Sequence, residues 1–243
     1  MTIDNVRFAI FIGILCCLLF LLLAALFLPK HHWEYDATPR HIKKYIEQLA
    51  SSLGRVCAPV NDGILRELYV RNDFASMLGW IKNSLHLDLK VGLRIVDAGG
   101  QTAPMWIELP RPMPMYGTSE FKRTRVIVNA RRDIIYGKPF EWVVAGFAHE
   151  LSHVVLFSIG HPFQHDEKAV DLTAMILGYR EFISNTDRTE IHGGAAAIGL
   201  SLILLPLGFL FIPGRTKSSL GYLTKAEKRH AYNYLRKIDQ QST

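Results

Sequence analysis

Residues 149–153 read His-Glu-Leu-Ser-His, so two imidazoles stand four positions apart and a carboxylate follows the first of them. Positions i and i+4 lie on one face of a helix, which lets His149 and His153 bind a single Zn²⁺. The side chain of Glu150 can then reach a water molecule at the metal and accept its proton. This HExxH pentapeptide therefore predicts a zinc centre that activates water for hydrolysis.

The pentapeptide lies within an apolar stretch that reads as one helix. Residues 142–148 and 154–157 are apolar on either side of it. Ionisable side chains inside a buried helix are costly unless they have partners, and a metal ion would be such a partner. The alternative is that both histidines are hydrogen-bonded core residues without a metal.

A third ligand is expected downstream of the pentapeptide. Residues 167–171 read Glu-Lys-Ala-Val-Asp and begin a second, largely apolar helix. Glu167 and Asp171 are four positions apart and therefore share a face of that helix. His161 and His165 precede it and are alternative third ligands, because zinc accepts imidazole as well as carboxylate.

The combined HExxH…ExxxD pattern resembles that of gluzincin-type zinc metallopeptidases. Its short spacer is most similar to the ImmA/IrrE-type and related small bacterial membrane-anchored zincins. The resemblance implies that Glu167 is the third zinc ligand and that Asp171 orients a liganding histidine from behind. It also implies that a strand at residues 125–129 is an edge strand above the zinc and pairs with an extended substrate.

The remaining patterns predict a few helices around a small sheet. Residues 90–96 alternate in polarity, residues 105–109 and 125–129 are short apolar runs, and all three read as strands. Thr224, followed three positions later by Glu227, is a capping box that starts a C-terminal helix. We therefore expect an α+β fold class, a small zincin-like domain with a short sheet and an HExxH helix, plus one or two transmembrane helices. Further helices are expected at residues 39–53, 64–70 and 74–85.

Two uncharged stretches predict insertion into a membrane. Residues 8–28 are long enough to cross ~30 Å of hydrocarbon as a helix, and residues 195–212 offer a second crossing. A cleaved signal peptide is the alternative for the first stretch, and a re-entrant or buried helix is the alternative for the second. The predicted localisation is a membrane, the cytoplasmic (inner) membrane if the source is bacterial. The side that faces the zinc site stays open, because the flanking charges conflict. The expected domains are an anchor at 1–29, a zincin-like domain at 30–192, a second span at 193–213 and a basic helical tail at 214–243.

Charge and cysteine content limit the kinds of partner and of cross-link that we expect. The formal net charge is +6, and much of the basic excess lies in residues 214–243. Its place beside an apolar segment favours an anionic lipid surface over nucleic acid, since no aromatic side chains interleave with a basic patch. Cys57 stands alone outside the apolar segments, so no disulfide framework is expected. The expected partners are a protein or peptide substrate and membrane lipid. No nucleic acid is expected, and no obligate partner can be inferred.

Together these features predict a membrane-anchored zinc metalloprotease, with Zn²⁺ on His149, His153 and Glu167. Glu150 would be its general base and then its proton donor. Two alternatives stay open. A zinc hydrolase of a non-peptide amide would lack a peptide-length groove beside residues 125–129. A membrane scaffold or sensor with a structural zinc site would have a fourth protein ligand. The candidates for stabilising an oxyanion are His161, His165 and Tyr179.

Overall fold

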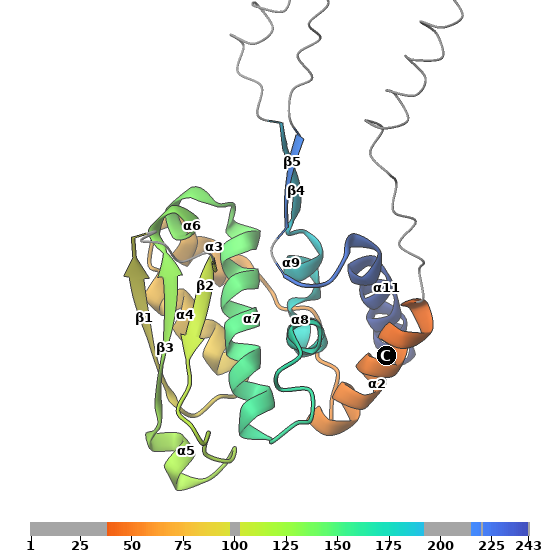
Figure 1. The fold of residues 1–243 in the computed structure, drawn as a ribbon, viewed down its shortest axis with the longest axis horizontal. Helices are drawn as coiled ribbons and strands as arrows, with labels where there is room; N and C mark the ends of the chain where they lie inside the picture. The colour runs from red at the N-terminus through yellow and green to blue at the C-terminus, as the bar shows by residue number, and fades with distance from the viewer. Residues whose placement is uncertain (1–37, 98–102, 192–214, 220, 243) are drawn as a thin grey trace, which may run out of the picture. The chain divides into compact units, whose positions relative to one another are not determined.

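The computed structural model describes residues 38–97, 103–191, 215–219 and 221–242. Contacts along the chain define two units, Met1–Asp36 and Ala37–Thr243, and all the described residues belong to the second. Figure 1 shows their helices and strands. The helices before α7 carry no site residue and are α2 (Thr38–Leu53), α3 (Gly63–Val70), α4 (Phe74–Ser84), α5 (Ser119–Arg123) and α6 (Arg132–Gly137). The helices predicted before the first strand are therefore confirmed, with ends that differ by one residue.

A three-stranded sheet lies beside the longest of the described helices. Its order is β1 (Lys90–Val96), β3 (Arg125–Arg131) and β2 (Met105–Glu108), with β1 parallel and β2 antiparallel to β3. The prediction that residues 125–129 form an edge strand is wrong, because β3 has a partner on each side. A central strand has no free N–H and C=O groups to offer a substrate, whereas β2 has one free edge.

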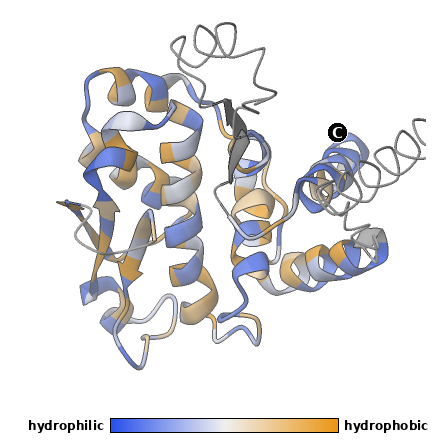
Figure 2. Ribbon diagram, turned by 45° about the horizontal axis from the view of Figure 1, so that its top comes forward, coloured by the Kyte–Doolittle hydropathy of each residue, from blue (hydrophilic) through white to orange (hydrophobic). Residues whose placement is uncertain are grey.

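Helix α7 (Phe140–Ser158) carries the HExxH residues and is the centre of the unit. It contacts α4 and β2 as well as α8 and α9, so other elements enclose most of its surface (Figure 1). Figure 2 shows hydrophobic residues along its length, as expected for a helix that is buried nearly all round. Gly146 permits the close approach of β2, because a Cβ atom there would lie 2.6 Å from Met105 Sδ. The helix predicted around residues 142–157 is confirmed.

Helix α8 (Glu167–Ala174) continues through a π-helical turn, η1 (Met175–Tyr179), into α9 (Arg180–Ser184). The turn departs from helical geometry at Gly178, whose φ of 102° lies in the region that favours glycine. The carbonyls of Ile176 and Gly178 accept hydrogen bonds from the N–H groups of Cys57 and Val60, at 2.8 and 3.0 Å. The segment before α3 is thereby tied to the helix that follows Glu167.

The C-terminal elements return to the same unit. β4 (Asp187–Ile191) and β5 (Arg215–Ser219) form an antiparallel pair, and α11 (Lys225–Ser242) contacts α2 and α9. The predicted capping box is confirmed. Thr224 Oγ1 accepts the N–H of Glu227 at 3.2 Å, and Glu227 Oε2 accepts the N–H of Thr224 at 2.7 Å. The start of α11 is therefore fixed by its own side chains.

The predicted fold class, α+β with one or two transmembrane helices, is corrected on two points. The described residues are mostly helical with a small three-stranded sheet, because three short strands cover only part of α7 and helices supply the rest of the core. Within the described ranges no helix is long and apolar enough to cross a membrane, and this finding contradicts the predicted membrane localisation as well. The longest helices, α7 and α11, both contain ionisable residues. The two stretches predicted to span, residues 8–28 and 195–212, lie outside the described residues.

Candidate metal centre

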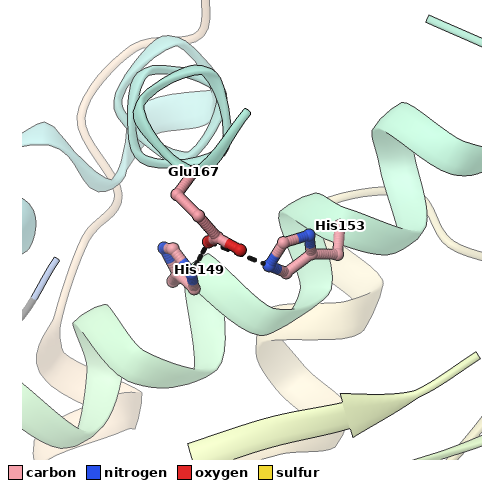
Figure 3. A group of neighbouring side chains, drawn as sticks. All are labelled: His149, His153 and Glu167. Carbon is pink, nitrogen blue, oxygen red and sulfur yellow. Dashed lines mark ion pairs between the residues drawn. The ribbon is translucent and has the colours of Figure 1, made fainter. Parts of the chain in front are cut away.

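Three side chains predicted to share a metal converge between α7 and α8. His149 and His153 lie one turn apart on α7, with ring centroids 5.1 Å from each other. Glu167 stands in the first turn of α8 and points at both rings (Figure 3). Its Oε2 atom lies 3.2 Å from Nε2 of His149 and 3.4 Å from Nε2 of His153. One ligand atom from each residue lies within 4.8 Å of the others.

These separations fit the geometry of a bound metal ion. Zinc bonds to imidazole nitrogen and carboxylate oxygen are ~2.0–2.1 Å long, so two ligands at a tetrahedral angle are ~3.3–3.4 Å apart. The two distances from Glu167 to the imidazoles match that spacing. The group of His149, His153 and Glu167 could therefore hold a metal ion.

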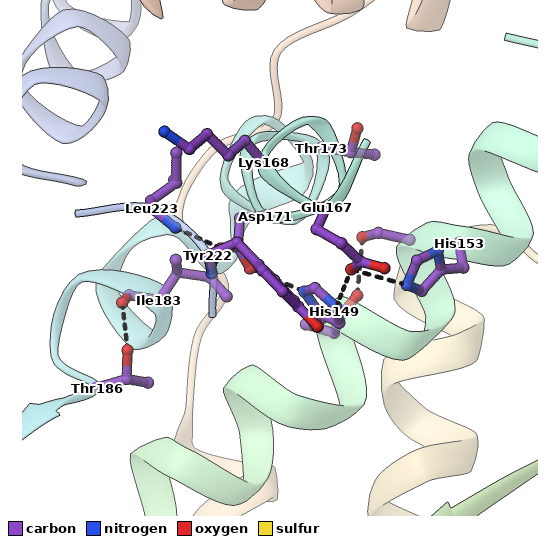
Figure 4. A network of polar contacts seen from close by, with 12 residues as sticks. His149, His153, Glu167, Lys168, Asp171, Thr173, Ile183, Thr186, Tyr222 and Leu223 are labelled. Carbon is purple, nitrogen blue, oxygen red and sulfur yellow. Dashed lines mark hydrogen bonds and ion pairs between the residues drawn. The ribbon is translucent and has the colours of Figure 1, made fainter. Parts of the chain in front are cut away.

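Asp171 orients His149 from the other side of the ring. Its Oδ1 atom lies 2.8 Å from Nδ1 of His149, and its side chain is 1 % exposed (Figure 4). A carboxylate can only accept hydrogen bonds, so Nδ1 carries a proton and Nε2, which faces Glu167, is the nitrogen that can bind a metal. The side chain of Asp171 thus stands where a carboxylate behind a metal-binding histidine would stand.

The start of α8 is fixed by its own cap, and this fixes the position of Glu167. Asp166 Oδ1 accepts the N–H groups of Lys168 and Ala169, at 2.9 and 3.4 Å. The hydroxyl of Tyr45 in α2 donates to the other oxygen of Asp166 at 2.8 Å. A capped first turn holds the next side chain in one direction, which here is toward α7.

Glu150 faces the same site and is nearly enclosed. It is 7 % exposed, and its carboxylate accepts a hydrogen bond from the backbone N–H of Ile107 in β2. Burial raises the pKa of Glu150 to about 7. The positive charge of His149 opposes this shift, and the negative charge of Glu167 adds to it. A carboxyl with a pKa near neutrality can both accept and return a proton.

The carboxylates give the site an affinity for positive charge. Burial disfavours the charged form of His149, but its hydrogen bonds to Asp171 and Glu167 outweigh burial and raise its pKa to about 10. Burial and the charge of His149 lower the pKa of His153 to about 4. In the metal-free protein at neutral pH, His149 therefore holds an extra proton on Nε2 and His153 is neutral. A metal cation would displace that proton, because a liganding imidazole must be neutral.

Two pockets adjoin these residues. One of about 350 Å³ extends along α7 toward Phe157, and another of about 330 Å³ extends toward Ala145. His149, Glu150 and Tyr222 line both pockets, together with Ala103 and Met105 beside or within β2. The open space thus continues past the metal-binding group in both directions along β2.

The other histidines and the tyrosine proposed from sequence have different positions. His161 is 5 % exposed and its Nδ1 accepts the N–H of Phe163 at 3.1 Å, and it lines neither pocket. His165 lines the larger pocket without belonging to the metal-binding group. Tyr179 is fully buried and shares a hydrogen bond with Ser84. It therefore cannot face a substrate, and it is removed as a candidate for stabilising an oxyanion.

Tyr222 is a site residue that the sequence did not reveal. Its ring stacks on that of His149, with centroids 6.0 Å apart and planes inclined by 23° (Figure 4). Its position between a glycine and a leucine carries no motif, and it follows the HExxH residues only after several intervening elements. Only the three-dimensional contact with His149 identifies it.

Comparisons with protein-family models, with curated proteins and with solved structures gave no match to this chain. The assignment of a function therefore depends on the chemistry of the site.

Proposed function

We propose that this protein is a zinc-dependent metallopeptidase of the gluzincin type. The observation that carries the proposal is the spacing of Glu167 Oε2 from the two imidazoles, 3.2 Å from His149 and 3.4 Å from His153. Two histidines and one carboxylate are a donor set that suits zinc, and three protein ligands leave a position for water or substrate. When bound, zinc would polarise the scissile carbonyl and make a water molecule more acidic.

Glu150 supplies the proton transfers in this proposal. Its carboxylate is held beside the metal-binding group by the N–H of Ile107, so it does not have to move to meet the attacking water. It accepts a proton from that water and later gives it to the leaving amine. In the metal-free protein burial raises its pKa to about 7, and a bound cation would lower that pKa and favour the carboxylate form that accepts the proton. Asp171 keeps His149 in the tautomer whose Nε2 can bind a metal.

The open space along β2 favours a peptide over a small amide as the substrate. β2 is an edge strand, and because its Ile107 N–H donates to Glu150, the unpaired edge of β2 faces the site. An extended peptide can add to such an edge through main-chain hydrogen bonds. Pockets on both sides of His149 and Glu150 leave room for residues before and after the cleaved bond. A hydrolase of a small amide would need only one of them.

A structural zinc site would require a fourth ligand from the protein. Among the residues that the structure describes, the metal-binding group contains two histidines and one glutamate. This composition supports a catalytic site, because the remaining position can take water.

The proposal is tested by metal analysis and proteolysis of the purified protein. Wild type should contain close to one zinc per chain and cleave an unfolded generic substrate such as casein. Glu150→Gln should keep the zinc and lose most of the cleavage. Glu141→Gln is the matched control, because it makes the same change in the first turn of the same helix, away from the site. Absence of zinc from wild type, or cleavage by Glu150→Gln at the wild-type rate, would refute the proposal.

A further inference from the structure

A segment far along the chain donates hydrogen bonds to the carboxylate that orients His149. The backbone N–H groups of Tyr222 and Leu223 donate to Asp171 Oδ2 at 2.7 and 3.2 Å. The other oxygen of Asp171 faces Nδ1 of His149 at 2.8 Å (Figure 4). Asp171 therefore accepts from the loop with one oxygen and from the histidine with the other. The orientation of His149 and the position of residues 221–223 depend on the same side chain.

Gly221 makes this arrangement possible. Its φ is +97°, and a Cβ atom built on it would lie 2.7 Å from Asp171 Oδ2 and 3.1 Å from Oδ1. Any other residue would press against the buried carboxylate and would also strain the backbone. The close approach explains how two consecutive N–H groups reach one oxygen of Asp171.

The segment is also held in place from the other side. It leads directly into the capping box of α11, and Lys168 Nζ donates to Glu227 Oε1 at 2.8 Å. Lys168 follows the proposed ligand Glu167 in α8. The first turn of α8 is therefore joined to the first turn of α11 by one ion pair, and its second turn is joined to residues 221–223 through Asp171.

We propose that residues 221–223 are a positioning element of the metal centre, and that glycine at position 221 is required for full metal affinity although it contacts no ligand atom. The segment holds the carboxylate of Asp171, which holds the ring of His149 with Nε2 toward Glu167. This inference rests on the metal-binding part of the proposed function and does not depend on peptidase activity.

The test compares two glycine substitutions. Gly221→Ala places a methyl group against Asp171, whereas Gly117→Ala makes the same change at a φ of +81° with no heavy atom within 4 Å of the new Cβ. Both variants suffer the backbone strain, so the comparison isolates the contact with Asp171. Zinc dissociation constants are measured by competition with a chromophoric chelator. Gly221→Ala should bind zinc 10–100-fold more weakly, as expected for the loss of a group that orients a ligand. Gly117→Ala should stay within about threefold of wild type.

A double-mutant cycle shows whether Gly221 acts through Asp171. In an Asp171→Ala background the methyl group of Gly221→Ala meets no carboxylate, so the second substitution should change zinc affinity less than twofold. If Gly221→Ala alone does not fold, the inference requires that the double variant regain folding. Equal zinc affinity in Gly221→Ala and Gly117→Ala, or additive losses in the cycle, would overturn the inference. Wild type that binds no zinc would instead refute the proposed function.

Discussion

Substitution of Asp171 by asparagine should weaken metal binding while preserving the shape of the site. Asp171 accepts three hydrogen bonds, one from Nδ1 of His149 and two from backbone N–H groups. An amide offers one oxygen and one NH₂ group, so it cannot accept on both sides. With its NH₂ toward His149, that ring must carry its proton on Nε2, where a metal would bind. With its NH₂ toward the loop, the N–H groups of Tyr222 and Leu223 lose their acceptor.

The size of the effect follows from these two orientations. The orientation that permits metal binding leaves buried N–H groups without an acceptor, which costs about 1–3 kcal/mol for a typical buried donor. Since 1.4 kcal/mol corresponds to a factor of ten in an equilibrium constant, the zinc dissociation constant should rise by ~10–100-fold. This range agrees with the usual effect of removing a hydrogen-bond partner of a metal ligand.

Chelator competition on purified Asp171→Asn and wild type measures this ratio. Asp133→Asn is the control, because Asp133 is exposed, pairs with Arg131 and lines neither pocket of the site. It removes the same charge outside the site. The control should bind zinc as wild type does. If Asp171→Asn binds zinc within threefold of wild type and remains folded, Asp171 does not orient His149 and the reasoning is wrong.

Three further outcomes are expected. Glu150→Gln should keep its zinc and lose ~10²–10⁴-fold or more of its turnover, because the residue moves protons and does not bind the ion; unchanged turnover in steady-state assays would contradict this role. Glu167→Ala should lose zinc on dialysis more readily than His161→Ala or His165→Ala, because only Glu167 contacts both imidazoles; the reverse ranking would move the third ligand to a histidine. In metal-free protein, folding raises the pKa of Glu150 from 4.5 to about 7 and so favours its protonated form. The free energy of unfolding of wild type, relative to that of Glu150→Gln, should therefore fall by on the order of 3 kcal/mol as the pH rises from 4.5 through 7. Parallel pH profiles in urea unfolding would show that Glu150 is not desolvated.

Local patterns predicted the parts of the site that lie close together in sequence. The spacing of His149 and His153 and the apolar residues around them predicted α7, and the four-residue spacing of Glu167 and Asp171 predicted α8. The capping pair Thr224 and Glu227 predicted the start of α11. Such features depend on residues three or four positions apart, which a helix brings together whatever the rest of the fold does.

Contacts between residues far apart in the sequence could not be predicted from local patterns. Residues 125–129 and 105–109 both read as short apolar strands, and nothing in either run states which of them is central. Only the order of strands in the sheet makes β2 the edge beside Glu150. Gly221 and Tyr222 have no motif of their own, and their roles arise from contacts with Asp171 and His149. Hydropathy alone led to the prediction of spanning helices, which depends on residues outside the described ranges.

The hydrogen bond between Asp171 and Tyr222 limits how early the site can become complete during protein synthesis. The two residues are 51 positions apart in the chain. A ribosome that adds ~5–20 residues per second needs ~3–10 s to make that stretch. During this interval the residues of α7 and of the first turn of α8 have been synthesised, but the N–H groups of Tyr222 and Leu223 that hold Asp171 have not. The centre can therefore become complete only after residues 221–223 have been made, well after the synthesis of α7 and α8.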